Sequence, residues 1–206
     1  MDVARPYTAV CPTLDGEVLR VLAGTTMLLT GREVARLAGR NSHSGVLNVL
    51  NRLTEHGLVT RVELNRAFLY ALNRDHLAAP AVDILAGMRE ELLSRVRREF
   101  GEWQIAPVHV SLFGSAARGD GDTRSDIDLL VIRASDVDED EPAWRAQIDG
   151  LSDQIQRWTG NYAGIVERTE SQIARLSADE LPILAELRSD AIVLSGSDIP
   201  TLLAAA

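Results

Sequence analysis

The chain has 206 residues, of which 46% are hydrophobic and 25% charged, which fits one large globular domain or two small ones. All of its basic residues are arginine, so chemistry that needs a lysine is excluded, including P-loop, protein-kinase and Schiff-base mechanisms. A lone cysteine, Cys11, excludes an internal disulfide and fits a reducing compartment. Without an apolar run of about 18 residues or a signal-peptide pattern, we expect a cytoplasmic protein.

The charge is distributed unevenly along the chain. Residues 1–80 carry nine Arg against seven Asp and Glu, a net of +2, whereas residues 81–206 carry twelve against twenty-three, a net of −11. This asymmetry predicts two domains, 1–78 and 79–206, with a linking helix at 79–103. An acidic domain repels nucleic acid, so we expect any such partner at the first domain.

Helical periodicity and stop signals dominate the first domain. Thr30 and Glu33 form a capping box, and Gly39 supplies a helix stop. A further helix is expected to begin near Asn41 or Ser42, and two β-like runs then meet at a two-residue turn. The expected elements are helices over 14–24, 29–39 and 40–59 and a hairpin of strands 58–64 and 67–72.

This order of elements resembles the winged helix-turn-helix fold of bacterial transcription regulators over residues 12–75. The resemblance implies a helix that enters the DNA major groove and a wing whose arginines approach phosphates. The alternative is a winged helix used for protein contact or for forming a homodimer. The residues expected at DNA are Asn41, Ser42, Ser44, Asn48 and Arg52 on the helix and Arg61 and Arg66 on the wing.

The second domain alternates helices and strands, which predicts an α/β (α+β) fold. Its helix at 79–103 is expected to bury Ile84, Met88, Leu92, Val96 and Phe100. Strands are expected at 107–115, 126–133, 162–169 and 191–196, and helices at 143–158 and 170–188.

Two aspartates, Asp126 and Asp128, stand at alternate positions of the apolar run DIDLLVIR. Alternate strand residues point to one side of a sheet, so the two carboxylates project together and repel each other. A divalent cation removes that penalty, and Mg²⁺ takes one or two carboxylates plus substrate phosphates. The turn at Gly114-Ser115 ends the preceding strand and offers backbone amides and a hydroxyl to phosphate oxygens. The pattern therefore indicates phosphoryl or nucleotidyl transfer.

The stretch GSAARGDGDTRSDIDLLV is similar to the signature of the polymerase-β-like nucleotidyltransferase superfamily, and most of all to its minimal members. Gly-Ser, ten intervening residues and Asp-x-Asp match that pattern position by position. The resemblance implies a mixed sheet flanked by helices, Mg²⁺ as cofactor, and transfer of a nucleoside monophosphate (NMP) from a nucleoside triphosphate (NTP), ATP above others, with release of pyrophosphate. It places Gly114 and Ser115 at the nucleotide, and Asp126 and Asp128 at the metal.

The family also uses a third carboxylate on a later strand, where it acts as base for the incoming hydroxyl. Glu167 is the only acidic residue within a later strand-like run of this sequence. The resemblance therefore assigns the role of this base to Glu167. The alternative is a solvent-facing Glu at the end of a strand, which would leave a site that binds nucleotide but turns over poorly. Arg118 and Arg124 are expected to reach triphosphate oxygens as bidentate donors.

Two functional hypotheses follow. The first is a nucleotidyltransferase that adds NMP to an acceptor hydroxyl on a partner protein or a small molecule such as an aminoglycoside. The second is a transcription regulator whose nucleotidyltransferase-like domain only senses a nucleotide. A purely structural use of both domains is disfavoured, because no structural role needs the Asp126 and Asp128 pair.

Overall fold

The computed structural model describes residues 1–39, 43–174 and 189–197. Its contacts divide the chain into an N-terminal unit, Pro6–Met88, and a C-terminal unit made of Met1–Arg5 with Arg89–Ala206. The predicted domains 1–78 and 79–206 stay a prediction. In the observed contacts the division falls after Met88, because helix α4 (Ala79–Ala86) packs on helix α1 of the N-terminal unit.

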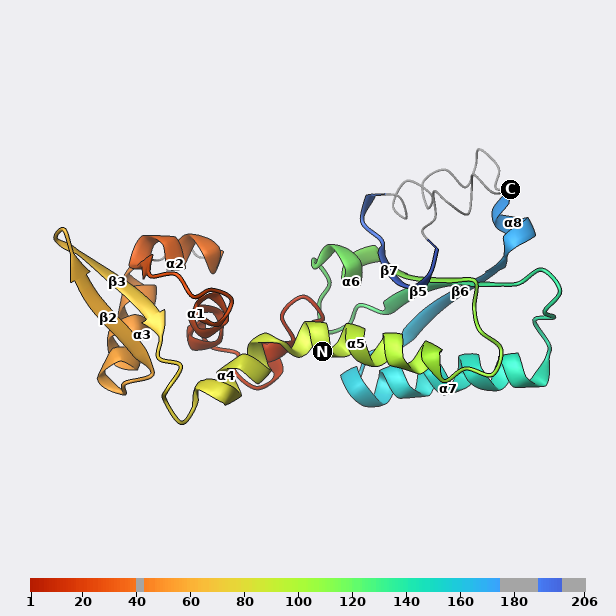
Figure 1. The fold of residues 1–206 in the computed structure, drawn as a ribbon, viewed down its shortest axis with the longest axis horizontal. Helices are drawn as coiled ribbons and strands as arrows, with labels where there is room; N and C mark the ends of the chain where they lie inside the picture. Colours follow the sequence, from red (N-terminus) through yellow and green to blue (C-terminus); the bar gives the residue numbers. More distant parts are fainter. Residues whose placement is uncertain (40–42, 175–188, 198–206) are drawn as a thin grey trace. The chain divides into compact units, whose positions relative to one another are not determined.

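The N-terminal unit combines helices with a small antiparallel sheet (Figure 1). The sheet has the strand order β1-β3-β2. After a 3-10 helix at Pro6–Ala9, the elements are α1 (Leu14–Ala23), β1 (Leu29–Thr30), α2 (Gly31–Leu37), α3 (His43–Glu55), β2 (Val59–Leu64), β3 (Ala67–Leu72) and α4 (Ala79–Ala86).

Local sequence signals explain where these helices begin and what they bury. The predicted capping box is present: Thr30 accepts from the backbone N–H of Glu33, and the Glu33 carboxylate accepts from the Thr30 N–H at 2.7 Å. Helix α3 buries Val46, Leu50 and Leu53 against α1 and α2. The expected start of α3 at Asn41 or Ser42 lies outside the described residues.

The predicted hairpin is confirmed, with β2 and β3 antiparallel and joined by Asn65 and Arg66. Both turn residues have positive φ, 49° and 65°, as a two-residue hairpin turn requires. The short strand β1 was not predicted, because two residues are too few for a periodicity to show. It pairs with β3 at Leu29 and Thr30.

The expected single helix over 79–103 is wrong, because Gly87 ends α4 and a second helix, α5 (Met88–Gly101), follows at once. Leu92, Val96 and Phe100 of α5 are buried as predicted. Ile84 on α4 is 70% exposed, contrary to the prediction, because the break separates it from the α5 stripe.

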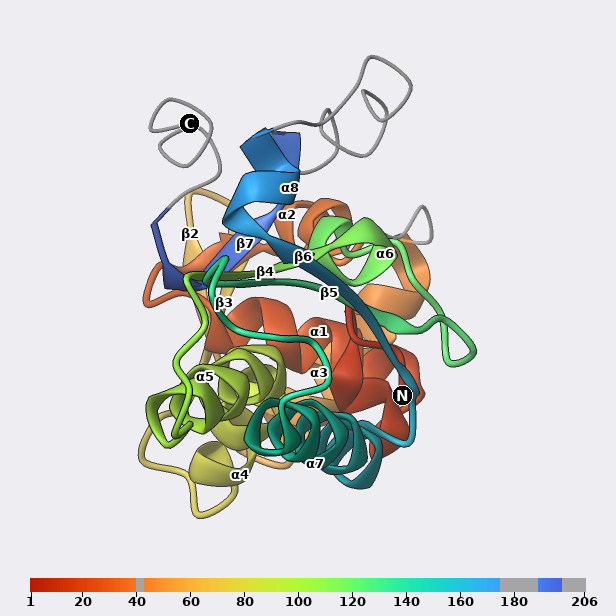
Figure 2. The ribbon, with the colours of Figure 1, turned by 90° about the vertical axis from the view of Figure 1, so that its right-hand side faces the viewer.

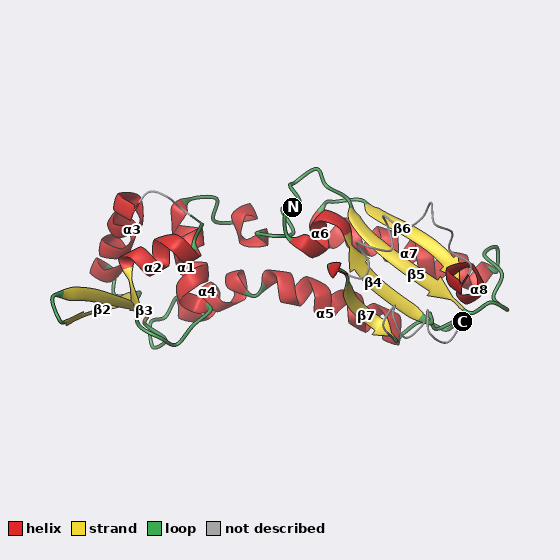
Figure 3. Ribbon diagram, turned by 90° about the horizontal axis from the view of Figure 1, so that it is seen from above, coloured by secondary structure: helices red, strands yellow, loops and turns green. Residues whose placement is uncertain are grey.

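The C-terminal unit is built on a mixed sheet with the strand order β6-β5-β4-β7 (Figure 3). Strand β5 runs parallel to β6 and antiparallel to β4, which is antiparallel to β7. The fold class predicted from the sequence, α/β with a mixed sheet, is thus confirmed. After α5 the elements are β4 (His109–Phe113), α6 (Gly114–Arg118), β5 (Ile127–Arg133), α7 (Pro142–Thr159), β6 (Ala163–Thr169), α8 (Glu170–Ala174) and β7 (Ile192–Gly196).

Helices α5 and α7 lie on one face of this sheet and α8 lies on the other (Figure 2). The larger core packs Leu129 and Val131 of β5 against Trp144 and Leu151 of α7. The smaller core, on the opposite face, includes Ile173 of α8. The predicted helix over 170–188 is observed as α8 at its start, and residues 175–188 lie outside the described part. Within the described ranges, no helix combines the length and apolarity that a membrane span requires.

A pair of leucines tests the hydrophobic core of the N-terminal unit. Leu50 is fully buried on α3, whereas Leu77 is 96% exposed before α4. We expect Leu50→Ala to lower the free energy of unfolding by about 2–5 kcal/mol, and Leu77→Ala to change it by less than about 0.5 kcal/mol. Urea unfolding followed by circular dichroism measures both, and equal effects would contradict the described packing.

Candidate functional site

Asp126 and Asp128 stand where the chain enters β5. Asp128 pairs with Phe113 of β4 on one side and with Gly164 of β6 on the other. Asp126 lies two residues earlier, just before the first strand residue, and its Cβ is 3.9 Å from the position that a Gly164 Cβ would occupy. Asp128 is half-buried and Asp126 exposed. The two side chains therefore meet beside Gly164, on one face of the sheet.

Two glycines make room for the Asp128 carboxylate. A Cβ on Gly164 would lie 2.6 Å from Asp128 Oδ1, and a Cβ on Gly114 would lie 2.5 Å from Asp128 Oδ2. Gly114 also has a φ of +65°, in the left-handed region that disfavours other residues. Sequence reasoning identified Gly114 and missed Gly164. The signal for it was a glycine inside the strand-like run YAGIVERT, which often marks a close backbone approach.

The predicted Ser115 follows Gly114 in the first turn of α6. Its hydroxyl oxygen is 2.9 Å from the position of a Gly121 Cβ, so the chain after α6 folds back over Ser115. The Ser115 carbonyl accepts from the backbone N–H groups of Gly119 and Asp120. The structure thus brings Gly114 to Asp128, and it places Ser115 against the loop that leads to Asp126.

The loop from Gly119 to Ser125 is held by its own polar groups. Ser125 Oγ accepts from the backbone N–H of Asp122 at 2.9 Å, so Asp122 is a turn residue. The backbone N–H of Arg124 donates to Asp122 Oδ1 at 2.7 Å and is the largest cause that lowers the pKa of the Asp122 carboxyl below its ordinary value.

The two candidate phosphate-binding arginines both border this loop. Arg118 Nε donates to the Asp120 carboxylate at 3.2 Å, and the Arg118 side chain is 36% exposed. The Arg124 side chain is 89% exposed, with its guanidinium 3.5 Å from the Asp122 carboxylate. The Arg124 pair joins two exposed groups, and such exposed pairs are weak, so this guanidinium can turn to an incoming anion.

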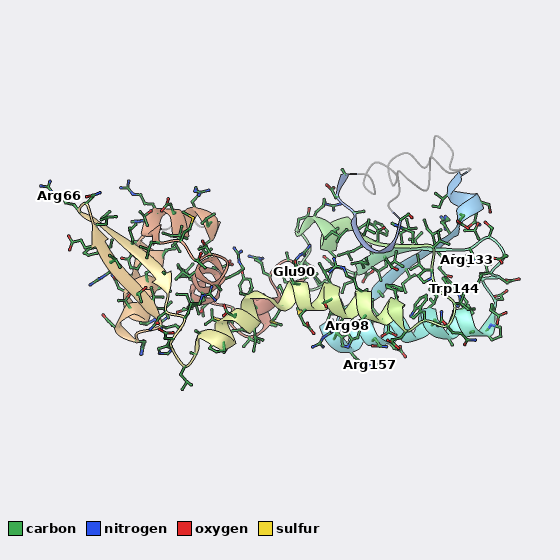
Figure 4. The ribbon with its side chains drawn as sticks, in the orientation of Figure 1. Arg66, Glu90, Arg98, Arg133, Trp144 and Arg157 are labelled. Atoms are coloured by element: carbon green, nitrogen blue, oxygen red, sulfur yellow. The ribbon has the colours of Figure 1, made fainter. Side chains whose placement is uncertain are left out.

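Glu167 does not join the Asp pair. It lies three residues after Gly164 on β6, and an odd number of steps along a strand changes the face, so Glu167 points to the side opposite Asp128. There its Oε2 accepts from Trp144 Nε1 at 2.7 Å, and its Oε1 lies 3.7 Å from Arg145. Figure 4 marks Trp144 on α7. The sequence could not show this, because the facing direction depends on the register of β5 and β6.

The donor set suits a magnesium–nucleotide complex more than a metal held by protein alone. Among the described residues no group of three His, Cys, Asp or Glu side chains could hold a metal ion. Mg²⁺ needs one or two carboxylates and takes its remaining ligands from water and substrate phosphates. Asp126 and Asp128 meet that need, and the absence of a side chain at Gly114 and Gly164 leaves room for the Asp128 carboxylate.

Two surface hollows lie away from this site, along helices α5 and α7. One, of about 410 Å³, is lined by Arg95, Arg98 and Trp158 among others, and the second includes Trp103 and Gln147. Both belong to the helical side of the sheet, whereas Asp128 faces the other side. Their size therefore does not identify a nucleotide pocket.

The residues expected at DNA are divided between α3 and the hairpin. Ser44, Asn48 and Arg52 are exposed at a spacing of four residues on α3, so they share one face, and the Arg52 guanidinium pairs with the Asp15 carboxylate. Ser42 lies outside the described residues.

On the wing, the guanidinium of Arg61 stacks over the Phe68 ring at 4.7 Å from its centre. Arg66 is exposed at the hairpin turn, where Figure 4 marks it.

A substitution at Gly164 tests the close approach to Asp128. Because the new Cβ of Gly164→Ala would meet Asp128 Oδ1, we expect the free energy of unfolding to fall by about 1–3 kcal/mol. The same change made in the Asp128→Ala background should cost far less, since the clashing oxygen is gone. Thermal or urea unfolding of the four proteins in this double-mutant cycle gives the coupling.

Gly150→Ala is the matched control, because a Cβ at that position of α7 has nothing within 4 Å. It should raise the free energy of unfolding by up to about 1 kcal/mol, as alanine favours a helix over glycine. Equal costs of Gly164→Ala with and without Asp128 would contradict the described approach.

Residues 89–187, slightly under half of the chain, match the family model of the nucleotidyltransferase domain. No curated protein matches the chain. A solved structure of a mutant of ZitR from Lactococcus lactis is 22% identical with a TM-score of 0.34, and the match covers 44% of this chain and 60% of that chain. A TM-score this low does not establish a shared fold.

The family match includes the Gly114-Ser115 turn and the Asp126 and Asp128 pair. The mixed sheet that carries this turn and this pair is consistent with a nucleotidyltransferase fold. The comparison therefore supports a nucleotidyltransferase domain at residues 89–187.

Proposed function

We propose that this protein is a Mg²⁺-dependent nucleotidyltransferase that moves an NMP from an NTP, ATP above others, to an acceptor hydroxyl on a protein or a small molecule. The observation that carries the proposal is the meeting of Asp126 and Asp128 on one sheet face, beside the turn at Gly114 and Ser115. The family match at residues 89–187 supports nucleotidyl transfer in general.

Different residues of the site would bind different parts of a magnesium–triphosphate complex. Asp126 and Asp128 would hold Mg²⁺, which when bound neutralises charge on the phosphates and on the leaving pyrophosphate. The Ser115 hydroxyl and the backbone around it would donate hydrogen bonds to phosphate oxygens. Arg118 and Arg124 would contribute bidentate charged donors from the loop.

The transfer itself replaces one phosphorus–oxygen bond by another. The acceptor oxygen bonds to the α-phosphorus as the bond to the pyrophosphate oxygen breaks, and the acceptor hydroxyl gives up its proton to a base. Glu167 was the expected base, but its carboxylate lies on the opposite sheet face with Trp144 and Arg145. In this geometry the residues at the Asp pair serve binding and alignment of the nucleotide.

The second candidate function is a transcription regulator whose C-terminal unit binds a nucleotide without turnover. The position of Glu167 favours it, because among the described residues the site then has two carboxylates, which would hold a metal–nucleotide complex, and no acid in the place of the family's base. Both candidate functions require nucleotide binding at this site. Only the first requires transfer of an NMP to an acceptor.

Calorimetric titration with each NTP, with and without Mg²⁺, tests the shared site. We expect Mg²⁺-dependent binding by the wild type, weakened at least about 10-fold in the Asp126→Ala/Asp128→Ala variant because the metal ligands are lost. The matched control is Asp136→Ala/Asp138→Ala, which removes a second Asp-x-Asp from the exposed loop before α7. Equal loss in both variants, or no binding by the wild type, would refute the site.

A transfer assay with labelled NTP then separates the two functions. Label that becomes covalently attached to a candidate acceptor, with release of pyrophosphate, supports the enzyme. Binding of NTP without transfer to any protein or aminoglycoside tested supports the regulator.

We also propose that the N-terminal unit binds double-stranded DNA as a winged helix. The order of its helices and its β1-β3-β2 sheet support this, as do the exposed Ser44, Asn48 and Arg52 on α3 and the exposed Arg66 at the hairpin turn. The helix would read base edges while the wing contacts phosphates.

Removing the charge of Arg66 tests the wing. We expect Arg66→Ala to weaken binding to a labelled duplex of mixed sequence and to lower the slope of log affinity against log salt by about 1, because one phosphate contact is lost. Arg157→Ala, which removes one exposed charge from α7, should change neither. Fluorescence anisotropy at several salt concentrations measures both, and equal effects of the two changes would contradict a wing contact.

A further inference from the structure

Asn161 is a buried polar side chain that sequence reasoning did not single out. It is 4% exposed and follows Gly160, whose φ of +76° ends helix α7 and turns the chain towards β6. Its backbone N–H donates to Thr159 Oγ1 at 3.1 Å, and its Oδ1 accepts from the Met1 nitrogen at 2.5 Å. These contacts fix the side chain in one place.

The amide nitrogen of the Asn161 side chain is directed to the segment that carries the Asp pair. Asn161 Nδ2 donates to the carbonyl oxygen of Ser125 at 2.9 Å, across 36 residues of sequence. The next residue, Tyr162, accepts at its carbonyl from the backbone N–H of Ile127, also at 2.9 Å. Ser125 and Ile127 flank Asp126, so two consecutive residues just before β6 hold the chain on both sides of that aspartate.

The two bonds differ in what they depend on. The bond from Ile127 to Tyr162 continues the ladder between β5 and β6, so any sequence in this fold would make it. The bond to Ser125 depends on the Asn161 side chain alone. It extends the hold of the sheet past the first strand residue, to the carbonyl that precedes the exposed Asp126.

We infer that Asn161 is a positioning residue for Asp126, which it holds in the place where that carboxylate binds the magnesium of the nucleotide complex. The inference rests on the proposed function. Hydrogen bonds that orient the ligands of a metal determine its affinity, and their loss costs about 10–100-fold. Nothing else among the described contacts of the Ser125 carbonyl replaces the amide.

The test measures how much Mg²⁺ is needed for nucleotide binding. In the full chain, NTP binding is titrated by calorimetry at increasing Mg²⁺, with the NTP that binds the wild type best. We expect Asn161→Ala to raise the Mg²⁺ concentration for half-maximal binding by about 10–100-fold and to recover wild-type binding at saturating Mg²⁺. Asn161→Asp, which keeps the volume but lacks the donor, should act in the same way and serves if the alanine variant does not fold.

Gln147→Ala is the matched control in the same unit. Gln147 also ties its side-chain amide to distant backbone, with 3.0 Å bonds to both the N–H and the carbonyl of Ile105, but on the helical side of the sheet. It should leave the Mg²⁺ requirement unchanged even if it lowers the melting temperature.

Each outcome decides the inference. An unchanged Mg²⁺ requirement in both Asn161 variants, or an equal loss of binding at every Mg²⁺ concentration, overturns it and leaves the proposed function standing. A wild type that binds no NTP at any Mg²⁺ concentration overturns both, because no metal complex then exists for Asn161 to position.

Discussion

The candidate site depends on one steric constraint, the approach of two backbones to the carboxylate of Asp128. Each of its oxygens occupies space that a side chain at Gly164 or Gly114 would fill. Strand β6 at Gly164 and the first residue of α6, Gly114, therefore approach Asp128 more closely than a side chain at either position would allow. The carboxylate lies between these two glycines near the start of β5.

Around this constraint the sheet separates two chemical environments. The face towards α5 and α7 carries the larger apolar core, and there Glu167 finds the indole of Trp144 and the guanidinium of Arg145 as partners. The other face carries Asp128 and the loop with Arg118 and Arg124. This separation of Glu167 from the Asp pair bears on both candidate functions, transfer of an NMP and sensing of a nucleotide. Under the proposed function, Asp126 and Asp128 would hold a metal–nucleotide complex, whereas the acid expected to activate an acceptor has its partners on the opposite face.

The two parts of the sequence differ in charge. Residues 81–206 have a net charge of −11, which disfavours nucleic acid, and Arg118 and Arg124 lie in or beside the loop that leads to the Asp pair. The N-terminal half has a net charge of +2 and shows exposed polar residues on α3 and an arginine at the hairpin turn. A regulator that senses a nucleotide and an enzyme that acts near DNA would both use this division of charge.

Local patterns by themselves determined the elements and most of the site. The capping box at Thr30, the turn at Asn65 and Arg66, and the alternation around Asp126 and Asp128 each depend on neighbours within a few residues, so they can be read from the sequence. The break of the expected long helix at Gly87 is also local, because a glycine ends α4 there. The tertiary structure alone decided two other matters: the register of β5 and β6 turned Glu167 away from Asp128, and Gly164 and Asn161 came to the segment of the Asp pair. Both depend on how separate elements pack, and a shift of one residue in strand pairing reverses every side chain, which no local pattern can reveal.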